Sequence, residues 1–346
     1  MRRLKAFWDP AQLAHAPSFF LQRGQVRGNY ETPARAESLL AGCKANGLDI
    51  VTPTAASREA LEAVHPADYL NWLAGAAADW AAMPGAGPEV VANIHPSPEM
   101  LTTGARPPAS VIGRAGWYAT DAACPIGPGT WGAAAAAAAC AVAAADEAAC
   151  NRDCYALCRP PGHHAYAARA GGHCYLNNAA LAVERLIGHG ARRVAVLDID
   201  SHHGNGTQGI FWSRSDVLFA SIHGDPAGYY PWYVGHADEL GAGAGLGCNR
   251  NFPLAAGTGD LGWLAALDAA LRAIERFGAD ALVVSLGFDA SRDEPLNFLA
   301  VSPDGFARAG AAIGRLALPA TFIQEGGYNT DTLGPLLGRF LDAFRG

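Results

Sequence analysis

The sequence predicts an α/β protein built around a mostly parallel β-sheet. From about residue 153 onward, short apolar runs without helical periodicity alternate with longer amphipathic stretches, the pattern of strands followed by helices. The chain also has material for a large core, since 50% of its 346 residues are hydrophobic and only 16% are charged. No linker divides it, so we expect a single domain over residues 1–346.

Each predicted element follows from its local pattern. Five apolar runs are short enough to be strands buried on both faces, and they cover residues 155–158, 193–197, 217–222, 281–286 and 320–323. Amphipathic stretches predict helices at residues 178–187, 261–277, 304–316 and 332–344. The alanine-rich stretch 133–149 predicts a helix that begins at Thr130. Because it carries Asp146 and Glu147, we expect a helix of a soluble protein and not a membrane span.

The N-terminal third shows no comparably clear periodicity. Residues 85–129 are rich in proline and glycine and predict a long loop or arm.

Composition excludes several classes of function. The net charge is −7, and lysine and arginine are scattered, so no nucleic-acid partner is expected and a cationic small substrate is favoured. Asp9-Pro10 interrupts the start before any signal-like apolar run, which predicts a cytoplasmic protein without a membrane partner. The eight cysteines are expected to be reduced thiols. The spacing Cys150-x3-Cys154-x3-Cys158 is not taken as a metal site, because its last member lies in a strand-like run.

Polar residues follow every one of the five predicted strands. Ligands of parallel sheets bind beyond the carboxyl ends of the strands, so these segments are expected to meet on one rim. They are residues 159–164, 198–204, 223–225, 287–289 and 325–328.

The segment after the second strand predicts a metal site. Asp198, Asp200 and His202 alternate with a period of two, so on extended backbone they share one face. Asp289, at the end of another strand, is the natural third ligand for a catalytic ion with one open position. Zinc, ferrous iron and cobalt all accept two carboxylates and one imidazole.

Three further residues predict hydrolytic chemistry beside this ion. His163 and His164 follow Pro160-Pro-Gly and could act as an acid–base pair on water activated by the metal, although surface histidines in a turn would look the same. Tyr328 follows two glycines and could donate its hydroxyl to the oxyanion of a tetrahedral intermediate.

Four motifs, in this order and spacing, resemble the zinc-dependent histone deacetylase superfamily. They are Arg159-Pro-Pro-Gly-His-His164, Asp198-x-Asp-x-His-His-Gly204, Ser285-Leu-Gly-Phe-Asp289 and Glu325-Gly-Gly-Tyr328. Other segments are similar to the bacterial acetylpolyamine amidohydrolases in particular, and they extend the likeness over nearly the whole chain. They are Gly116-Trp-Tyr118, Pro128-Gly-Thr-Trp131, Leu157-Cys-Arg-Pro-Pro161, Ile222-His-Gly-Asp-Pro226 and Ser302-Pro-Asp304.

The resemblance implies the arginase–deacetylase fold, an eight-stranded, mostly parallel sheet sandwiched by helices. It implies zinc on Asp200, His202 and Asp289, acid–base catalysis by His163 and His164, and an electrophilic role for Tyr328.

The resemblance also implies supporting sites. Asp198 and Asn205 match the partners that fix the tautomers of the two histidines. Asp198 matches part of a structural potassium site, together with the Ser221 hydroxyl and the carbonyl groups of Asp200, His202 and Ile222.

Substrate selection is where the sequence departs from the family. The arm at about residues 85–129 is similar in position to an insertion that forms a homodimer and narrows a substrate tunnel. Its acid, Asp121, matches the family's ammonium-binding acid only after a shift of about two residues. His173 stands at a position where the family's tunnel wall has Phe or Tyr, and Arg169 lies just upstream. A cation near the tunnel would disfavour a polycationic substrate by Coulomb repulsion. Tyr230 is expected near the tunnel mouth.

The expected function is therefore a zinc-dependent deacetylase that releases acetate from small N-acetylated amines, such as acetylpolyamines. Two alternatives stay open: a protein acetyl-lysine deacetylase, and a non-catalytic protein that binds acyl-amines. A two-manganese hydrolase of the arginase type would need further bridging carboxylates, and the sequence supplies one Asp-x-His set.

Overall fold

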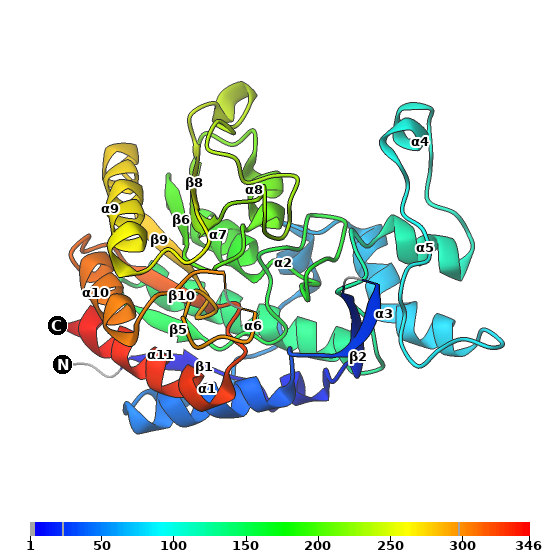
Figure 1. The fold of residues 1–346 in the computed structure, drawn as a ribbon, viewed down its shortest axis with the longest axis horizontal. Coiled ribbons are helices and arrows are strands. Elements are labelled where there is room, and N and C mark those ends of the chain that lie inside the picture. The colour runs from blue at the N-terminus through cyan, green and yellow to red at the C-terminus, as the bar shows by residue number, and fades with distance from the viewer. Residues whose placement is uncertain (1–3, 23, 297) are drawn as a thin grey trace.

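The centre of the molecule is an eight-stranded sheet in which every neighbouring pair of strands is parallel. The computed structural model describes residues 4–22, 24–296 and 298–346. The strand order is β4-β1-β5-β10-β9-β6-β7-β8 (Figure 1). The strands are β1 (Lys5–Phe7), β4 (Asp49–Val51), β5 (Cys154–Ala156), β6 (Val194–Asp198), β7 (Val217–Gly224), β8 (Asn249–Leu254), β9 (Ala281–Leu286) and β10 (Ala320–Gln324). The predicted α/β class is confirmed.

All five predicted strands are present, as β5, β6, β7, β9 and β10, and β5 begins and ends earlier than expected. Sequence reasoning missed β1, β4 and β8. The first two have only three residues each, too few to show a pattern, and β8 is an edge strand with half-exposed positions and a proline. A separate antiparallel hairpin, β2 (Phe19–Gln22) with β3 (Gln25–Gly28), was also missed.

Helices cover both faces of the sheet. The longer ones are α1 (Pro33–Ala45), α3 (Ala67–Ala81), α6 (Thr130–Ala149), α7 (Asn178–Gly188), α9 (Asp260–Phe277), α10 (Pro303–Gly314) and α11 (Thr330–Arg345). The shorter ones are α2 (Arg58–Glu62), α4 (Pro98–Thr102), α5 (Val111–Trp117), α8 (Asn205–Phe211) and the 3-10 turns η1 (Pro10–Ala14) and η2 (Gly243–Gly245).

Successive residues of a strand belong alternately to two hydrophobic clusters, one on each face of the sheet. Val194 and Val196 of β6 belong to the cluster with α3, α6 and α7. Ala195 and Leu197 belong to the cluster with α1, α9, α10 and α11. This three-layer arrangement explains why the strands are apolar at every position.

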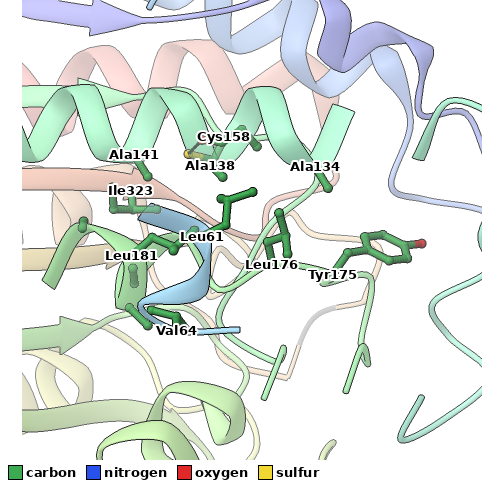
Figure 2. Packing of buried hydrophobic residues seen from close by; sticks show 14 of the residues in the cluster. Leu61, Val64, Ala134, Ala138, Ala141, Cys158, Tyr175, Leu176, Leu181 and Ile323 are labelled. Atoms are coloured by element: carbon green, nitrogen blue, oxygen red, sulfur yellow. Dashed lines mark hydrogen bonds between the residues drawn. The ribbon is translucent and has the colours of Figure 1, made fainter. Parts of the chain in front are cut away.

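Helix α6 lies inside the first cluster, where its small side chains allow close packing. Figure 2 shows Ala134, Ala138 and Ala141 facing the cluster that contains Leu61 and Leu181. Among the described residues, α6 alone is long and apolar enough to pass a test for membrane-spanning helices, and 61% of its most apolar window is buried in the protein. Such burial is typical of a core helix.

The segment 85–129 is more ordered than the predicted loop. It contains α4 and α5, and Val90 and Ile126 pair across its base. Figure 1 shows the part that carries α4 standing away from the sheet. The division into one domain with this insertion stays a prediction.

Candidate metal and catalytic site

The three predicted metal ligands lie together beyond the carboxyl ends of β6 and β9. Nδ1 of His202 is 3.2 Å from Oδ1 of Asp200 and 2.9 Å from Oδ2 of Asp289. Both carboxylates are fully buried, and one ligand atom from each residue lies within 4.8 Å of the others. Two carboxylate oxygens and one imidazole nitrogen suit a divalent ion such as zinc, so the donor set fits the expected metal.

Backbone amides hold this ligand set in place. The amides of His202 and Gly326 donate to the two oxygens of Asp200, at 2.9 Å and 2.7 Å, and the amide of Ser201 donates to Oδ1 of Asp289 at 2.8 Å. The close approach requires glycine: a Cβ on Gly287 would lie 2.1 Å from Oδ2 of Asp200. The loops after three different strands therefore fix the ligands.

The charges at this point favour a cation. Burial disfavours the ionised carboxylate of Asp200, but His163 and His202 hold its pKa below the usual range. Burial also disfavours a protonated His202, yet Asp289 and Asp200 raise its pKa to about 9. Without a metal, a proton on His202 is the charge that these carboxylates stabilise.

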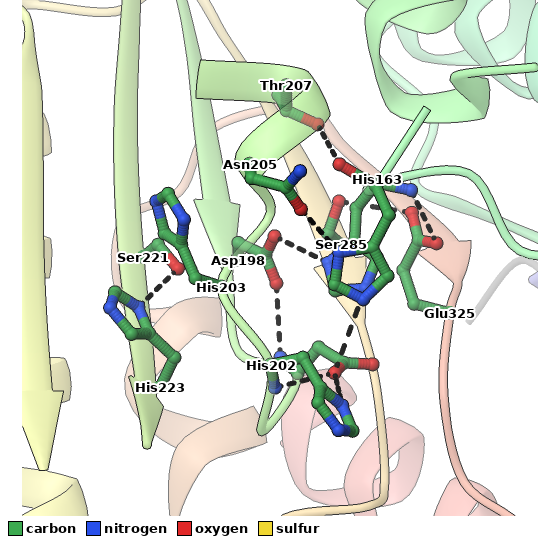
Figure 3. A network of polar contacts seen from close by, with 12 residues as sticks. His163, Asp198, His202, His203, Asn205, Thr207, Ser221, His223, Ser285 and Glu325 are labelled. Atoms are coloured by element: carbon green, nitrogen blue, oxygen red, sulfur yellow. Dashed lines mark hydrogen bonds and ion pairs between the residues drawn. The ribbon is translucent and has the colours of Figure 1, made fainter. Parts of the chain in front are cut away.

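His163 and His164, the predicted acid–base pair, are adjacent but have different partners. Nδ1 of His163 lies 3.0 Å from Oδ2 of Asp198 (Figure 3). Nδ1 of His164 lies 2.6 Å from Oδ1 of Asn205. Their ring centroids are 4.0 Å apart. The buried carboxylate of Glu325, whose role sequence reasoning did not assign, accepts hydrogen bonds from the amides of Gly162 and His163.

The different partners separate the protonation of the two rings. Burial opposes a charge on His163, but Asp198 and Asp200 raise its pKa to about 10. Burial, with the positive charges of His163 and His202 nearby, lowers the pKa of His164 well below its usual value. One ring is thus a cation and the other is neutral, as an acid–base site requires.

Tyr328 lies beside this group and is half-buried. The guanidinium carbon of Arg35, from α1, is 4.8 Å from the centre of its ring. Arg35 also donates from Nε to the carbonyl oxygen of Gly327, and from Nη2 to that of Glu325, both at 2.5 Å. Sequence reasoning missed Arg35, because it comes from the N-terminal third and belongs to no motif.

His173 forms part of the wall next to Tyr328. It is buried, with its ring 5.6 Å from that of Phe20 and 6.2 Å from that of Tyr328. Burial lowers its pKa to about 4, so the ring is neutral at pH 7. Arg169 lies over the ring of Trp117, at 6.0 Å. His173 itself therefore adds no positive charge, and the effect of Arg169 on a polycationic substrate stays a prediction.

Asp121 and Tyr230 also come together near the catalytic histidines. The Tyr230 hydroxyl donates to Oδ2 of Asp121 at 2.6 Å, and the edge of its ring packs on His164 with centroids 4.9 Å apart. The amides of Gly172 and Ala123 also donate to Asp121. Its carboxylate is thus engaged by groups of the protein itself.

The predicted potassium ligands are neighbours in the sheet. Asp198 is opposite Ser221 in the register of β6 and β7, and Ile222 follows Ser221. The Ser221 hydroxyl lies 2.8 Å from Nδ1 of His223. The potassium ion itself stays a prediction.

Comparisons with known proteins identify the family and the fold. The model of the histone deacetylase domain family matches residues 29–344. An acetylpolyamine amidohydrolase 1 of Pseudomonas aeruginosa is 44% identical, with 93% of each chain covered. An acetylpolyamine amidohydrolase of Burkholderia pseudomallei is also 44% identical, with 94% of each chain covered. The crystal structure of an acetylpolyamine aminohydrolase from Burkholderia pseudomallei superposes with a TM-score of 0.94, at 42% identity, over 99% of this chain and 98% of the other.

Proposed function

Because this chain belongs to the histone deacetylase domain family, we propose that it hydrolyses small N-acetylated amines, such as acetylpolyamines, to acetate and free amine. It is a deacetylase with the arginase–deacetylase fold. The observation that carries the proposal is the convergence of an Asp–His–Asp ligand set with the paired histidines His163 and His164. The charges of Asp289 and Asp200 also act on the hydroxyl of Tyr328.

The family is generally zinc-dependent, and Asp200, His202 and Asp289 are the residues that would hold the ion. When bound there, zinc supplies a Lewis acid that polarises the acetyl carbonyl and lowers the pKa of water. Ferrous iron and cobalt fit the same ligands.

The two histidines divide the proton chemistry according to their partners. His164 faces the neutral amide of Asn205, so its ring is free to take a proton from the attacking water. The same ring then returns this proton to the amine nitrogen as the C–N bond breaks. His163, held as a cation by Asp198, favours the negative charge that develops on the acetyl group.

Tyr328 supplies a hydrogen-bond donor for the acetyl oxygen. Burial raises the pKa of its hydroxyl well above the usual value, so the group keeps its proton during turnover. Donors of this kind act most strongly on the charge that forms in the transition state.

The wall residues favour a slim amine. His173 and Tyr230 present uncharged rings beside Tyr328 and His164, respectively, and Asp121 accepts a hydrogen bond from the Tyr230 hydroxyl. Further parts of the proposal are a structural potassium ion at Asp198, Ser221 and Ile222, and a homodimer formed through the arm at residues 85–129, where α4 stands clear of the sheet.

A substrate panel tests this function. Acetate release by metal-reconstituted enzyme should be faster with acetylputrescine or acetylspermine than with an acetyl-lysine peptide. Tyr328→Phe should lower kcat by about two orders of magnitude or more, because it removes the oxyanion donor. Tyr233→Phe is the matched control, since its side chain is 86% exposed.

Three results would contradict the proposal. A clear preference for the peptide would identify a protein deacetylase, and undiminished turnover by Tyr328→Phe would remove the oxyanion role. Tight binding of acetylated amines without turnover would identify a non-catalytic binding protein.

A further inference from the structure

Glu294 is a buried carboxylate that contacts the backbone of Tyr328. Its side chain is 4% exposed. Oε2 accepts a hydrogen bond from the amide of Tyr328 at 2.8 Å, and Oε1 accepts one from the amide of Asn329 at 3.1 Å. A single side chain thus satisfies two consecutive amides at the start of α11.

The geometry of these contacts suits a carboxylate. Each of the two amides meets its own oxygen, and a glutamate side chain offers both oxygens as acceptors. A glutamine would offer one oxygen and would turn its NH2 group toward the second amide. Burial, together with the charge of Asp289, raises the pKa of Glu294 to about 7, while the two amide hydrogen bonds favour its ionised form.

Glu294 belongs to the same turn as a metal ligand. The turn leaves β9 through Asp289 and is closed by hydrogen bonds from Ser291 to Phe288 (3.1 Å) and from Glu294 to Ser291 (3.3 Å). The Asn329 side chain donates to the carbonyl oxygen of Asp293 at 2.8 Å. Asn329 thus contacts this turn through its side chain as well as through its backbone amide.

Tyr328 is therefore held from two sides. Arg35 donates to the carbonyl oxygen of Gly327 on one side, and Glu294 accepts from the Tyr328 amide on the other. The turn that begins at Asp289 thereby sets the distance between the ligand set and the tyrosine.

We propose that Glu294 is a positioning residue that places the Tyr328 hydroxyl relative to the metal ligands through the hydrogen-bonded turn 289–294. The inference rests on the proposed function, since it assumes that Tyr328 acts on the acetyl oxygen. Misplacing a catalytic group by about 1 Å costs on the order of a hundredfold in rate.

Kinetics of a double-mutant cycle test the positioning role. Glu294→Ala should lower kcat by about tenfold to a hundredfold and leave KM within about threefold, because the group acts in the transition state. When Glu294→Ala is added to Tyr328→Phe, kcat should fall by less than about twofold relative to Tyr328→Phe alone, because the hydroxyl that Glu294 positions is gone. Glu294→Gln repeats the test with a side chain of nearly equal volume.

The matched control is Asp293→Asn. This side chain neighbours Glu294 but is 49% exposed, and only the backbone of Asp293 contacts Asn329. Its kcat should equal that of the unchanged enzyme. Metal content is measured for every variant.

Amide hydrogen exchange gives a readout that does not depend on activity. Protection of the Tyr328 and Asn329 amides should fall in Glu294→Ala and Glu294→Gln, and should be retained in Asp293→Asn. If protection falls in the Glu294 variants but the unchanged enzyme hydrolyses no acetylated amine, the proposed function is wrong, while the hydrogen bonds of Glu294 to the Tyr328 and Asn329 amides are confirmed.

Three results would overturn the positioning role. They are unchanged protection in both Glu294 variants, an equal loss of kcat with and without the Tyr328 hydroxyl, and a loss of kcat that follows a loss of bound metal.

Discussion

At the scale of single residues, the site depends on which partner each ionisable group has. Asp198 raises the pKa of His163, whereas burial and the positive charges of His163 and His202 lower that of His164, although the two rings are only 4.0 Å apart. Because Asn205 is a neutral partner, it adds no negative charge that would reverse this lowering.

His65 shows how burial alone fixes a protonation state. Its Nδ1 donates to the carbonyl oxygen of Ala167 at 2.8 Å, and its Nε2 accepts from the amide of Asn177 at 2.9 Å. Nε2 can accept only in a neutral ring, so the bond from Asn177 is lost when His65 takes up a proton. Burial lowers the pKa of His65 to about 4, although the bond to Ala167 opposes this.

The pH dependence of stability follows from this shift. In the unfolded chain His65 has a pKa near 6.5, so below that pH the unfolded chain binds a proton that the native ring does not. The free energy of unfolding therefore falls as the pH drops toward 4. His65→Gln removes this pH-dependent contribution to stability. The variant should be less stable at pH 7, and its deficit should shrink by about 2 kcal/mol at pH 5. Urea unfolding at both pH values measures it, and a deficit that stays constant would contradict the neutral ring.

The residues of the site could be predicted from sequence where they lie in motifs after strands. Asp200, His202 and Asp289 converge as the alternation and the strand ends predict. Arg35 and Glu294 could not be found this way, because each acts on the backbone of a distant segment. A backbone contact leaves no pattern of residue types in the sequence.

At the scale of elements, the sequence predicted helices and strands correctly where burial produces a long apolar or amphipathic run of residues. The five central strands and the helices α6, α7, α9, α10 and α11 all have such runs. Strands β1 and β4 have three residues each, and they gain their extended geometry by pairing with neighbouring strands of the sheet. Tertiary pairing decides such short elements, and local sequence does not.

Close packing of α1 on α11 depends on glycine. A Cβ on Gly42 would lie 2.6 Å from the carbonyl oxygen of Gly334. Gly42→Ala should therefore lower the free energy of unfolding by roughly 1–3 kcal/mol, because the helices must separate.

The control for this prediction is Gly132→Ala in α6. A Cβ there would meet no atom within 4 Å, and the position is exposed. This substitution should raise stability by about 0.5–1 kcal/mol through helix propensity. Thermal and urea unfolding compare the two, and equal effects of the same sign would contradict the packing argument.

At the scale of the whole molecule, a buried ion network joins the N-terminal third to the active site. Glu31 is paired with Arg35 at 2.7 Å and with Arg159 at 2.9 Å, and all three side chains are at most 1% exposed. Arg159 begins the segment that carries His163 and His164, and Arg35 contacts the backbone next to Tyr328. The N-terminal third, which was hardest to predict, thus supports both segments that carry the proposed catalytic residues.

The central claim is that one metal ion on Asp200, His202 and Asp289 supports amide hydrolysis. The most direct measurement is acetate release from acetylputrescine by metal-depleted enzyme as zinc is added stepwise. Activity should be absent at the start, should rise with added zinc and should saturate at one ion per chain, and Asp289→Ala should not respond. Hydrolysis by the depleted enzyme at the full rate, or saturation only at two ions per chain, would contradict the claim.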